Sequence, residues 1–420
     1  DDTQAPPPPP DVQPLYDWCY AESVKRFVHL GTLELLDESQ FNRRMAVHNF
    51  SIQGEKCAAY TYFKGTGRQM VDTVTYLPGH AVKAVTPAGK SAINLWTPPA
   101  LGAWNTPPQD QDVQVWLDHW KYLVPDQAAR DHILDWLAFV AQHPAEKINH
   151  ALFLGGAPGI GKNMALKPIY EAVGRQNKCD LSPEGLAEVY TEWAKETRLV
   201  VVEEMRNFET KAVMNKLKPY LTAPPDEISI RPMHHPRYDA PNVLQFIFMS
   251  NFKDALSLEP GDRRYFVYWS PADPQSEQYY TTLAGWLENG GIEKVVGWLH
   301  DRDVSAFKPA APPPRTDAKR DMELAGQPEG VKLVLDMIAE YDPPFAGEAV
   351  VLSDAWSAVK AKAQGTKVTR NHVETALKLS GGGPVPGGAN GGRVVWIDGK
   401  AKRVWATRDT TACDAMPAAA

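Results

Sequence analysis

The fold of this 420-residue chain follows from one stretch, Gly155-Gly156-Ala157-Pro158-Gly159-Ile160-Gly161-Lys162-Asn163. Residues 156–162 fit the phosphate-binding pattern G-x-x-x-x-G-K. In this pattern the glycines let successive backbone N–H groups turn inward around phosphates, and the Lys ammonium reaches the terminal ones. Asn163 stands where the pattern has Ser or Thr, whose hydroxyl normally ligates Mg²⁺. The stretch predicts a nucleotide site lined by residues 156–163.

The sequence on either side has the elements that such a loop requires. Residues 151–154 (Ala-Leu-Phe-Leu) form an apolar run typical of a buried parallel strand, and residues 164–173 have helical spacing. The N-terminus of that helix would present partial positive charge to phosphates. The alternative is a glycine-rich turn with a chance Lys, which a strand before and a helix after disfavour. We therefore predict an α/β fold with a parallel sheet.

A second apolar run, residues 198–204 (Arg-Leu-Val-Val-Val-Glu-Glu), ends in two acids. A buried strand that delivers Glu203 and Glu204 to its carboxyl end supplies what Mg²⁺-dependent triphosphate hydrolysis needs. One carboxylate holds the metal, and the next polarises the attacking water. The alternative is an ordinary strand before a solvated acidic turn, and the phosphate-binding pattern upstream makes it the lesser interpretation.

Two later strands carry polar residues at their ends. Residues 246–251 (Phe-Ile-Phe-Met-Ser-Asn) predict a core strand followed by Asn251, whose amide would orient water or sense a γ-phosphate. An ordinary turn is the alternative. Arg263 and Arg264 precede the apolar strand 266–269. Either guanidinium would stabilise transition-state charge on a neighbouring subunit's phosphates, and a surface ion pair explains either Arg equally well.

In this order the loop, the acids, the strand-end Asn and the paired Arg resemble the superfamily 3 helicases of viruses and phages. This AAA+-like family includes the phage and poxvirus-type primase–helicases, to which the chain looks most similar over roughly residues 110–270. The resemblance implies ATP and Mg²⁺ as cofactors and a homo-hexameric ring. The implied roles are Lys162 on the β/γ-phosphates, Asn163 and Glu203 at Mg²⁺, Glu204 as catalytic base, Asn251 as sensor, and Arg263 or Arg264 as the finger supplied in trans.

Asn163 departs from the pattern of that family. A carboxamide oxygen ligates a hard cation directly or through water. We therefore expect ATP hydrolysis to occur with Asn at this position, at a reduced rate.

The same family carries a DNA-binding β-hairpin in the central channel of the ring, between the acids and the sensor. Residues 215–222 and 228–238 fill that position here. Basic side chains would contact phosphates, and His or Tyr rings would stack or hydrogen-bond along the strand. The alternative is a solvated hairpin tip with incidental charge. The predicted DNA-binding residues are Lys216, Lys218, Arg231, His234, His235, Arg237 and Tyr238.

Composition limits the other possibilities. The net charge of −7 argues against nucleic-acid binding by the whole surface, but not against a basic channel. The Cys residues are scattered without a C-x-x-C pair, which suits a reducing cytosol and gives no zinc site. No apolar run has membrane-spanning length and no signal peptide opens the chain. We expect a cytoplasmic protein, in the host cytoplasm for a phage, and Asp1 in place of Met indicates a piece of a longer replication protein.

Before the core, the sequence predicts a Pro-rich linker over residues 1–14 and an accessory α+β domain over residues 15–105. That domain ends in Asn94-Leu95-Trp96, similar to a signature of phage primase–helicases, and shows no primase carboxylate cluster. Residues 106–150 carry a Trp-rich helical stripe. The stripe is either ordinary core or the collar that the family uses for subunit association.

After the ATPase unit at residues 151–307, we predict a second linker at 308–328 and a disordered tail at 409–420. Between them, residues 329–408 predict three helices and a β-hairpin, which resembles a winged helix. It would bind DNA, or serve only structure or protein binding. Its DNA-facing residues would be Lys367, Arg370, Asn371, His372, Lys378, Lys400, Lys402 and Arg403.

The sequence therefore predicts a ring-forming, ATP-driven DNA helicase of phage or viral replication. It would act on single-stranded and forked DNA beside a primase or polymerase domain or protein, with no membrane partner. The alternatives are a ring ATPase that loads or remodels replication complexes without unwinding, a P-loop kinase, and a DNA-binding scaffold with a weakened ATPase. A P-loop kinase does not need an Arg from a second subunit. Asn163 is the only feature that favours the scaffold alternative.

Overall fold

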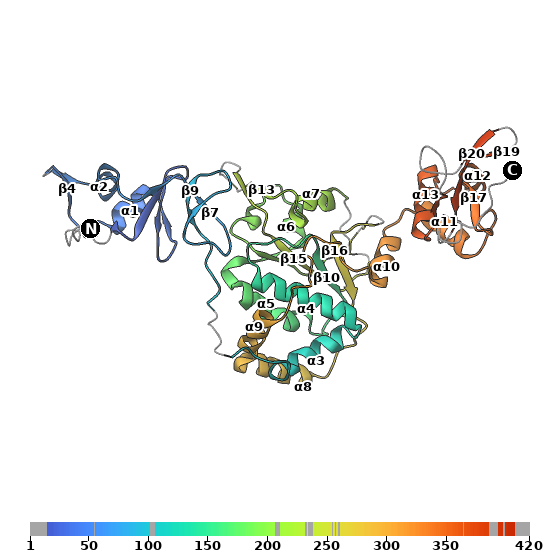
Figure 1. Cartoon of the computed structure of the whole chain (residues 1–420), viewed down its shortest axis with the longest axis horizontal. Helices are drawn as coiled ribbons and strands as arrows, with labels where there is room; N and C mark the ends of the chain where they lie inside the picture. Colours follow the sequence, from blue (N-terminus) through green and yellow to red (C-terminus); the bar gives the residue numbers. More distant parts are fainter. Residues whose placement is uncertain are drawn as a thin grey trace.

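The computed structural model runs from a small N-terminal α+β unit through a central sheet to a C-terminal helical unit (Figure 1). The predicted segments 1–14 and 409–420 lie outside the residues that the structure describes. None of the helices in the described part combines the length and apolar character that crossing a lipid bilayer demands. The described residues are 15–53, 55–100, 106–205, 211–231, 233, 238–253, 255–256, 258, 261–363, 365–385, 394–397 and 400–407.

A five-stranded parallel sheet forms the centre of the molecule, which confirms the predicted α/β class. Its strands, apart from an edge strand, are almost wholly buried and rich in Val, Leu and Phe, as in parallel sheets covered on both faces. The spatial order is β11 (Lys178–Leu181), β12 (Leu199–Val202), β15 (Gln245–Ser250), β10 (Ala151–Gly155) and β16 (Tyr265–Trp269).

Alternate side chains of each strand enter two separate cores, one on each face of the sheet. Leu152 and Leu154 of β10 belong to the first core, and Phe153 belongs to the second. The first core is closed by α3 (Gln114–Leu123), α4 (Gln127–Gln142), α5 (Lys162–Val173), α8 (Glu277–Trp286) and α9 (Ile292–Asp301). The second is closed by α6 (Pro183–Ala187), α7 (Lys211–Leu221) and α10 (Asp317–Ala325).

The Trp-rich stripe of α3 and α4 lies inside the first core. Trp116 and Trp136 are 1% and 0% exposed. Their indole N–H groups donate to the carbonyls of Ala165 on α5 and of His150 before β10. Packing against the sheet accounts for the stripe, and the collar role stays a prediction.

The prediction of a free linker at residues 308–328 is wrong. Helix α10 lies within it and packs against β16, with Met322 buried in the second core. The Lys319 ammonium donates to the Tyr265 carbonyl at 2.8 Å, and the Glu323 carboxylate accepts from the Gly261 N–H at 3.3 Å. The Pro-rich start of the segment suggested a linker, whereas the apolar side of a short amphipathic helix decides its place.

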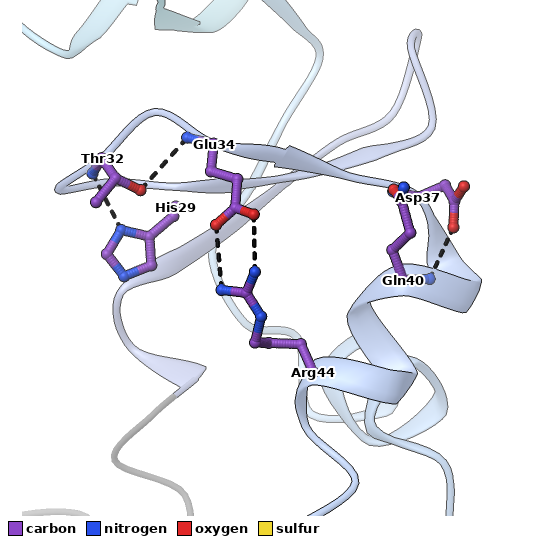
Figure 2. A network of polar contacts seen from close by, with 6 residues as sticks. All are labelled: His29, Thr32, Glu34, Asp37, Gln40 and Arg44. Carbon is purple, nitrogen blue, oxygen red and sulfur yellow. Dashed lines mark hydrogen bonds and ion pairs between the residues drawn. The ribbon is translucent and has the colours of Figure 1, made fainter.

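The N-terminal unit contains a small sheet and two helices. The sheet has the order β3 (Leu35–Leu36), β2 (Arg26–His29), β1 (Trp18–Ala21) and β6 (Met70–Val71). Helices α1 (Glu38–Arg44) and α2 (Ala59–Gly65) pack on it. Asp37 and Gln40 form a capping box at the start of α1, and Arg44 pairs with Glu34 through both carboxylate oxygens (Figure 2).

The remaining N-terminal strands form two further small sheets. One pairs β4 (Phe50–Ile52) with β5 (Glu55–Cys57), and the other has the order β7 (Thr73–Thr75), β9 (Ser91–Asn94) and β8 (Lys83–Val85). The Asn94 amide, which is fully buried, accepts from the Leu77 N–H and donates to the carbonyls of Leu77 and His80. Asn94 thus holds a turn, which gives the Asn-Leu-Trp signature a structural reason.

The C-terminal unit has the predicted elements. Three helices, α11 (Glu329–Ala339), α12 (Leu352–Lys362) and α13 (Arg370–Leu379), pack on an antiparallel sheet. In that sheet β20 (Lys400–Ala406) pairs with β17 (Ala349–Val351), β18 (Gly383–Pro384) and β19 (Val394–Ile397). The predicted turn residues 398–399 lie outside the described part.

Two imidazoles, those of His132 and His150, are packed together inside the central unit. His132 Nε2 on α4 lies 3.1 Å from His150 Nε2, and the rings contact Phe266 and Phe307. Burial lowers the pKa of His132 to about 4 and that of His150 well below its usual range, with Lys319 and Lys147 adding repulsion. Both groups are therefore neutral in the folded protein at neutral pH.

Because these pKa values are lower in the folded than in the unfolded chain, the unfolded chain binds more protons below about pH 6.5. We expect the free energy of unfolding to be fully present above that pH and to fall by roughly 3 kcal/mol as the pH drops towards 4. Urea unfolding followed by Trp fluorescence measures it. His132→Phe should flatten the pH dependence, whereas His80→Gln, at an exposed residue, should not. An equally steep loss in His132→Phe would contradict this assignment.

Candidate functional site

The loop between β10 and α5 has the backbone shape that a phosphate cradle needs. Gly156, Gly159 and Gly161 have φ angles of +150°, +78° and +88°, which side-chain-bearing residues rarely adopt. A β carbon on Gly156 would also lie 2.8 Å from the Ile160 side chain. Ile160 itself is fully buried, and its side chain belongs to the first core beneath the loop. The predicted loop residues Ala157 and Pro158 are half-exposed and exposed.

Lys162, the first residue of α5, reaches back over the loop. Its ammonium donates to the carbonyls of Gly156 at 2.9 Å and Ala157 at 3.0 Å, and to Asn251 Oδ1 at 2.8 Å. Partial burial lowers the pKa of Lys162. The fold therefore brings together Lys162 and Asn251, which the sequence analysis assigned to one site from positions 89 residues apart.

The two acids lie at the same carboxyl edge of the sheet. Val202, the last residue of β12, is in register with Phe248 of β15, and Glu203 and Glu204 follow it, both exposed. Glu204 has a φ of +54°, in the left-handed region that non-glycine residues seldom occupy. Such backbone strain gathers at functional sites.

A buried serine holds this edge in position, and the sequence analysis assigned it no role. Ser250 is 1% exposed, and its hydroxyl donates to the Met205 carbonyl just beyond the acids. The Met205 N–H in turn donates to the Met249 carbonyl at 3.0 Å. The segment after Glu204 is thus tied to β15 beside Asn251. A polar residue directly after the apolar run 246–249 was the available signal.

The donor set at this edge fits a hydrated divalent cation held with phosphates. Mg²⁺ keeps several waters and takes only one or two protein oxygens beside phosphate oxygens. Glu203 and Asn163 are exposed oxygen donors at the ends of β12 and the loop. In the part of the chain that the structure describes, no group of three or more His, Cys, Asp or Glu side chains makes a closed metal site.

Arg263 and Arg264 lie at the opposite edge of the sheet. They precede β16, whose Tyr265 is in register with Ala151, whereas the loop follows Gly155 at the other end of β10. The two Arg residues and the loop are therefore separated by about 13 Å along the strand direction. Neither Arg can therefore reach the loop of its own chain.

The two Arg residues differ in their surroundings. The Arg264 guanidinium is half-buried and pairs with Asp262 at 2.9 Å, and its backbone N–H donates to the same carboxylate. Arg263 is exposed, and its guanidinium has no hydrogen bond or ion pair with any described residue. The structure thus distinguishes residues that the sequence left equivalent.

The predicted hairpin is present as β13 (Glu227–Ile230) and β14 (Tyr238–Pro241), paired antiparallel. The guanidinium of Arg231, at its tip, lies 5.7 Å from the ring centre of Tyr190. Tyr190 and Met233 are 37% and 46% exposed. Tyr190 was missed by the sequence analysis because an isolated Tyr in a polar loop gives no pattern. The predicted residues His234, His235 and Arg237, and the side chain of Tyr238, lie outside the described part.

Lys216 contacts backbone groups of its own chain, and its predicted role in DNA binding stays a prediction. Its ammonium donates to the carbonyls of Leu186, Ala187 and Glu188. These contacts hold α7 against the end of α6, and burial lowers the pKa of Lys216. Lys218, on the same helix, is half-buried.

Comparisons with known proteins identify related folds. Residues 153–264 match the model of a family described only as a family of unknown function (DUF5906). No protein with a curated description matches the sequence. The apo structure of the NrS-1 C-terminal region (305–718) superimposes with a TM-score of 0.65 and 14% identity, covering 94% of this chain and 99% of that one. The chain has the fold of that region. An A-form apo structure of the same region gives a TM-score of 0.61 at 14% identity, covering 92% and 95%.

Proposed function

We propose that this chain is an ATP-driven DNA helicase of phage or viral replication, active as a ring of identical subunits. One observation carries the proposal: Lys162, Asn251 and the two acids share one edge of the sheet, whereas the exposed Arg263 lies at the other. A complete hydrolytic site then requires an Arg from a second copy. The fold shared with the C-terminal region of NrS-1, a phage primase–helicase, supports a role in phage replication.

Each residue at the edge has a chemical task in this proposal. Lys162 exchanges its loop carbonyls for β/γ-phosphate oxygens. Glu203 and Asn163 would hold Mg²⁺, which would neutralise phosphate charge. Asn251 orients the attacking water with its amide, and Glu204 accepts the proton that this water loses. Arg263 of the neighbouring copy stabilises the charge that develops on the transferred group.

The hairpin supplies the grip on DNA. Arg231 contacts a phosphate, and Tyr190 beneath it offers a face on which a base stacks, a combination that binds single strands without sequence preference. Thr191 holds the tip of the hairpin, because its hydroxyl accepts from the Arg231 N–H at 2.9 Å. ATP-dependent movement between subunits would then carry the hairpin along the strand.

Single-stranded DNA should stimulate ATP hydrolysis several-fold, and ATP should drive assembly into a ring that separates forked DNA. Phosphate release with and without DNA, mass measurement under ATP and a strand-separation assay test this. No stimulation together with a monomeric mass under ATP would refute the helicase proposal. Stimulated hydrolysis in a ring that leaves forked DNA intact would instead favour loading or remodelling.

Replacing Asn163 by Ser should raise the rate of ATP hydrolysis several-fold and lower the Mg²⁺ concentration required. The hydroxyl ligates Mg²⁺ directly, whereas the exposed carboxamide of Asn163 is a longer ligand that leaves more of the coordination to water. Asn163→Ala, which removes the oxygen, should lower the rate of ATP hydrolysis and raise the Mg²⁺ concentration required. Unchanged turnover and Mg²⁺ dependence in Asn163→Ser would show that this residue takes no part in metal binding.

A further inference from the structure

Aromatic side chains stand beside the loop on the flank that the catalytic residues do not occupy. They are Tyr122 of α3 and Tyr279 and Tyr280 of α8. A β carbon on Gly161 would lie 3.1 Å from Cε1 of Tyr280, so this ring is in contact with the loop. All three side chains are half-buried.

Tyr279 has a supporting role in this group. Its hydroxyl is 2.9 Å from Nδ1 of His119, and Nε2 of the same imidazole is 3.0 Å from the Gly161 carbonyl. His119 is fully buried, and burial lowers its pKa. The His119–Tyr279 pair therefore fixes the last turn of the loop from beneath.

The strand order gives the direction in which a nucleotide must extend. Lys162 points to Asn251 at the end of β15, which places the terminal phosphate on the β15 side of β10. On the other side lies β16, and the chain beyond it passes Gly159 through Pro274. A phosphate chain whose end lies towards β15 directs its nucleoside towards β16 and α8.

We propose that Tyr280, supported by Tyr122, forms the platform on which the base of the bound nucleotide stacks. This inference rests on the proposed function and adds the base to it. The Tyr280 hydroxyl accepts from the Gln275 N–H at 3.0 Å, and the Tyr122 hydroxyl donates to the Asp273 carbonyl at 2.6 Å. These backbone contacts, the stacking of Tyr122 on His119 and the edge-to-face contact of Tyr280 with Tyr279 hold the two rings in place beside the loop.

A platform that offers ring faces binds bases without recognising their edges. Every nucleobase has a π-face, and stacking on an aromatic side chain is therefore tolerant of the base. The site should accept purine nucleoside triphosphates as a class, with ATP and GTP bound within a few-fold of each other. Adenine-specific recognition would require edge contacts that these tyrosines do not provide.

Calorimetric titration of the full chain with MgATP, MgGTP and inorganic triphosphate tests the platform. Tyr280→Ala should weaken both nucleotides by about 10-fold and leave triphosphate binding unchanged, because the phosphates are held by the loop. Tyr280→Trp should restore nucleotide affinity. Gln278→Ala, at an exposed neighbour on α8, should change nothing.

Several results would overturn the platform. One is undiminished ATP affinity in Tyr280→Ala, and another is an equal loss for ATP and triphosphate, which would mean a disturbed loop. Equal affinity of the wild type for ATP and triphosphate would show that the protein has a phosphate site but no base subsite. If the wild type binds neither ATP nor triphosphate, both the platform and the proposed function are refuted.

Discussion

Lys162→Ala is expected to reduce ATP turnover by about 10³-fold, the scale on which single electrostatic contacts to a transition state act. In the structure this ammonium touches two loop carbonyls and the Asn251 amide. In the proposed site its loss would remove both the positive charge that contacts the terminal phosphates and the group that aligns Asn251. Triphosphate binding should fall as well, because the same charge holds the ground state.

Phosphate release at saturating MgATP measures the effect, with Lys167→Ala as the matched control. Lys167 is half-buried on the same helix and carries the same charge. Its variant should retain nearly full turnover and should unfold at a similar urea concentration. If Lys162→Ala kept a tenth or more of the wild-type rate, hydrolysis at this loop would be ruled out.

Arg263→Ala should lower turnover by about 10³-fold or more, as the loss of an arginine finger does elsewhere. Arg264→Ala should act mainly on stability, because Arg264 is committed to Asp262 within its own chain. Comparison of the two variants by phosphate release and by urea unfolding separates these effects. Equal losses of turnover with unchanged stability would contradict the distinction drawn from their surroundings.

The finger also predicts complementation between inactive subunits. Because Arg263 lies at the far edge of the sheet from its own loop, a Lys162→Ala subunit still offers an intact finger. An Arg263→Ala subunit still offers an intact loop. Mixing them should restore part of the turnover that each lacks alone. Failure to recover activity, in mixtures shown to co-assemble, would exclude action in trans.

The sequence was sufficient for features that depend on neighbouring residues. The glycine spacing around Lys162 and the apolar runs of β10, β12 and β15 are local patterns, and each predicted element formed. The hairpin β13–β14 and the helices of the C-terminal unit were predicted for the same reason. Their local preferences and their tertiary surroundings agree.

Other features depend on partners far away in the chain. The charge of Lys216 gave no sign that carbonyls at the end of α6 would accept from its ammonium. Arg264 could not be distinguished from Arg263 without Asp262 in its observed place. The polar edge strand β11 has no apolar run to reveal it. The strand order, which places β15 between the loop and the acids, follows from pairing that no local pattern encodes.

Helix α10 shortens the connection to the C-terminal unit to residues 326–328, a reach of at most about 10 Å. A free segment of the predicted length would have allowed a separation of about 25 Å in any orientation. The same helix contacts the turn that carries Arg263 on both of its sides. The Glu323 carboxylate accepts from the Gly261 N–H, and the Lys319 ammonium donates to the Tyr265 carbonyl. Tension applied to the C-terminal unit by whatever it binds would therefore be delivered directly to the turn that carries Arg263, so load and hydrolysis would share one mechanical element.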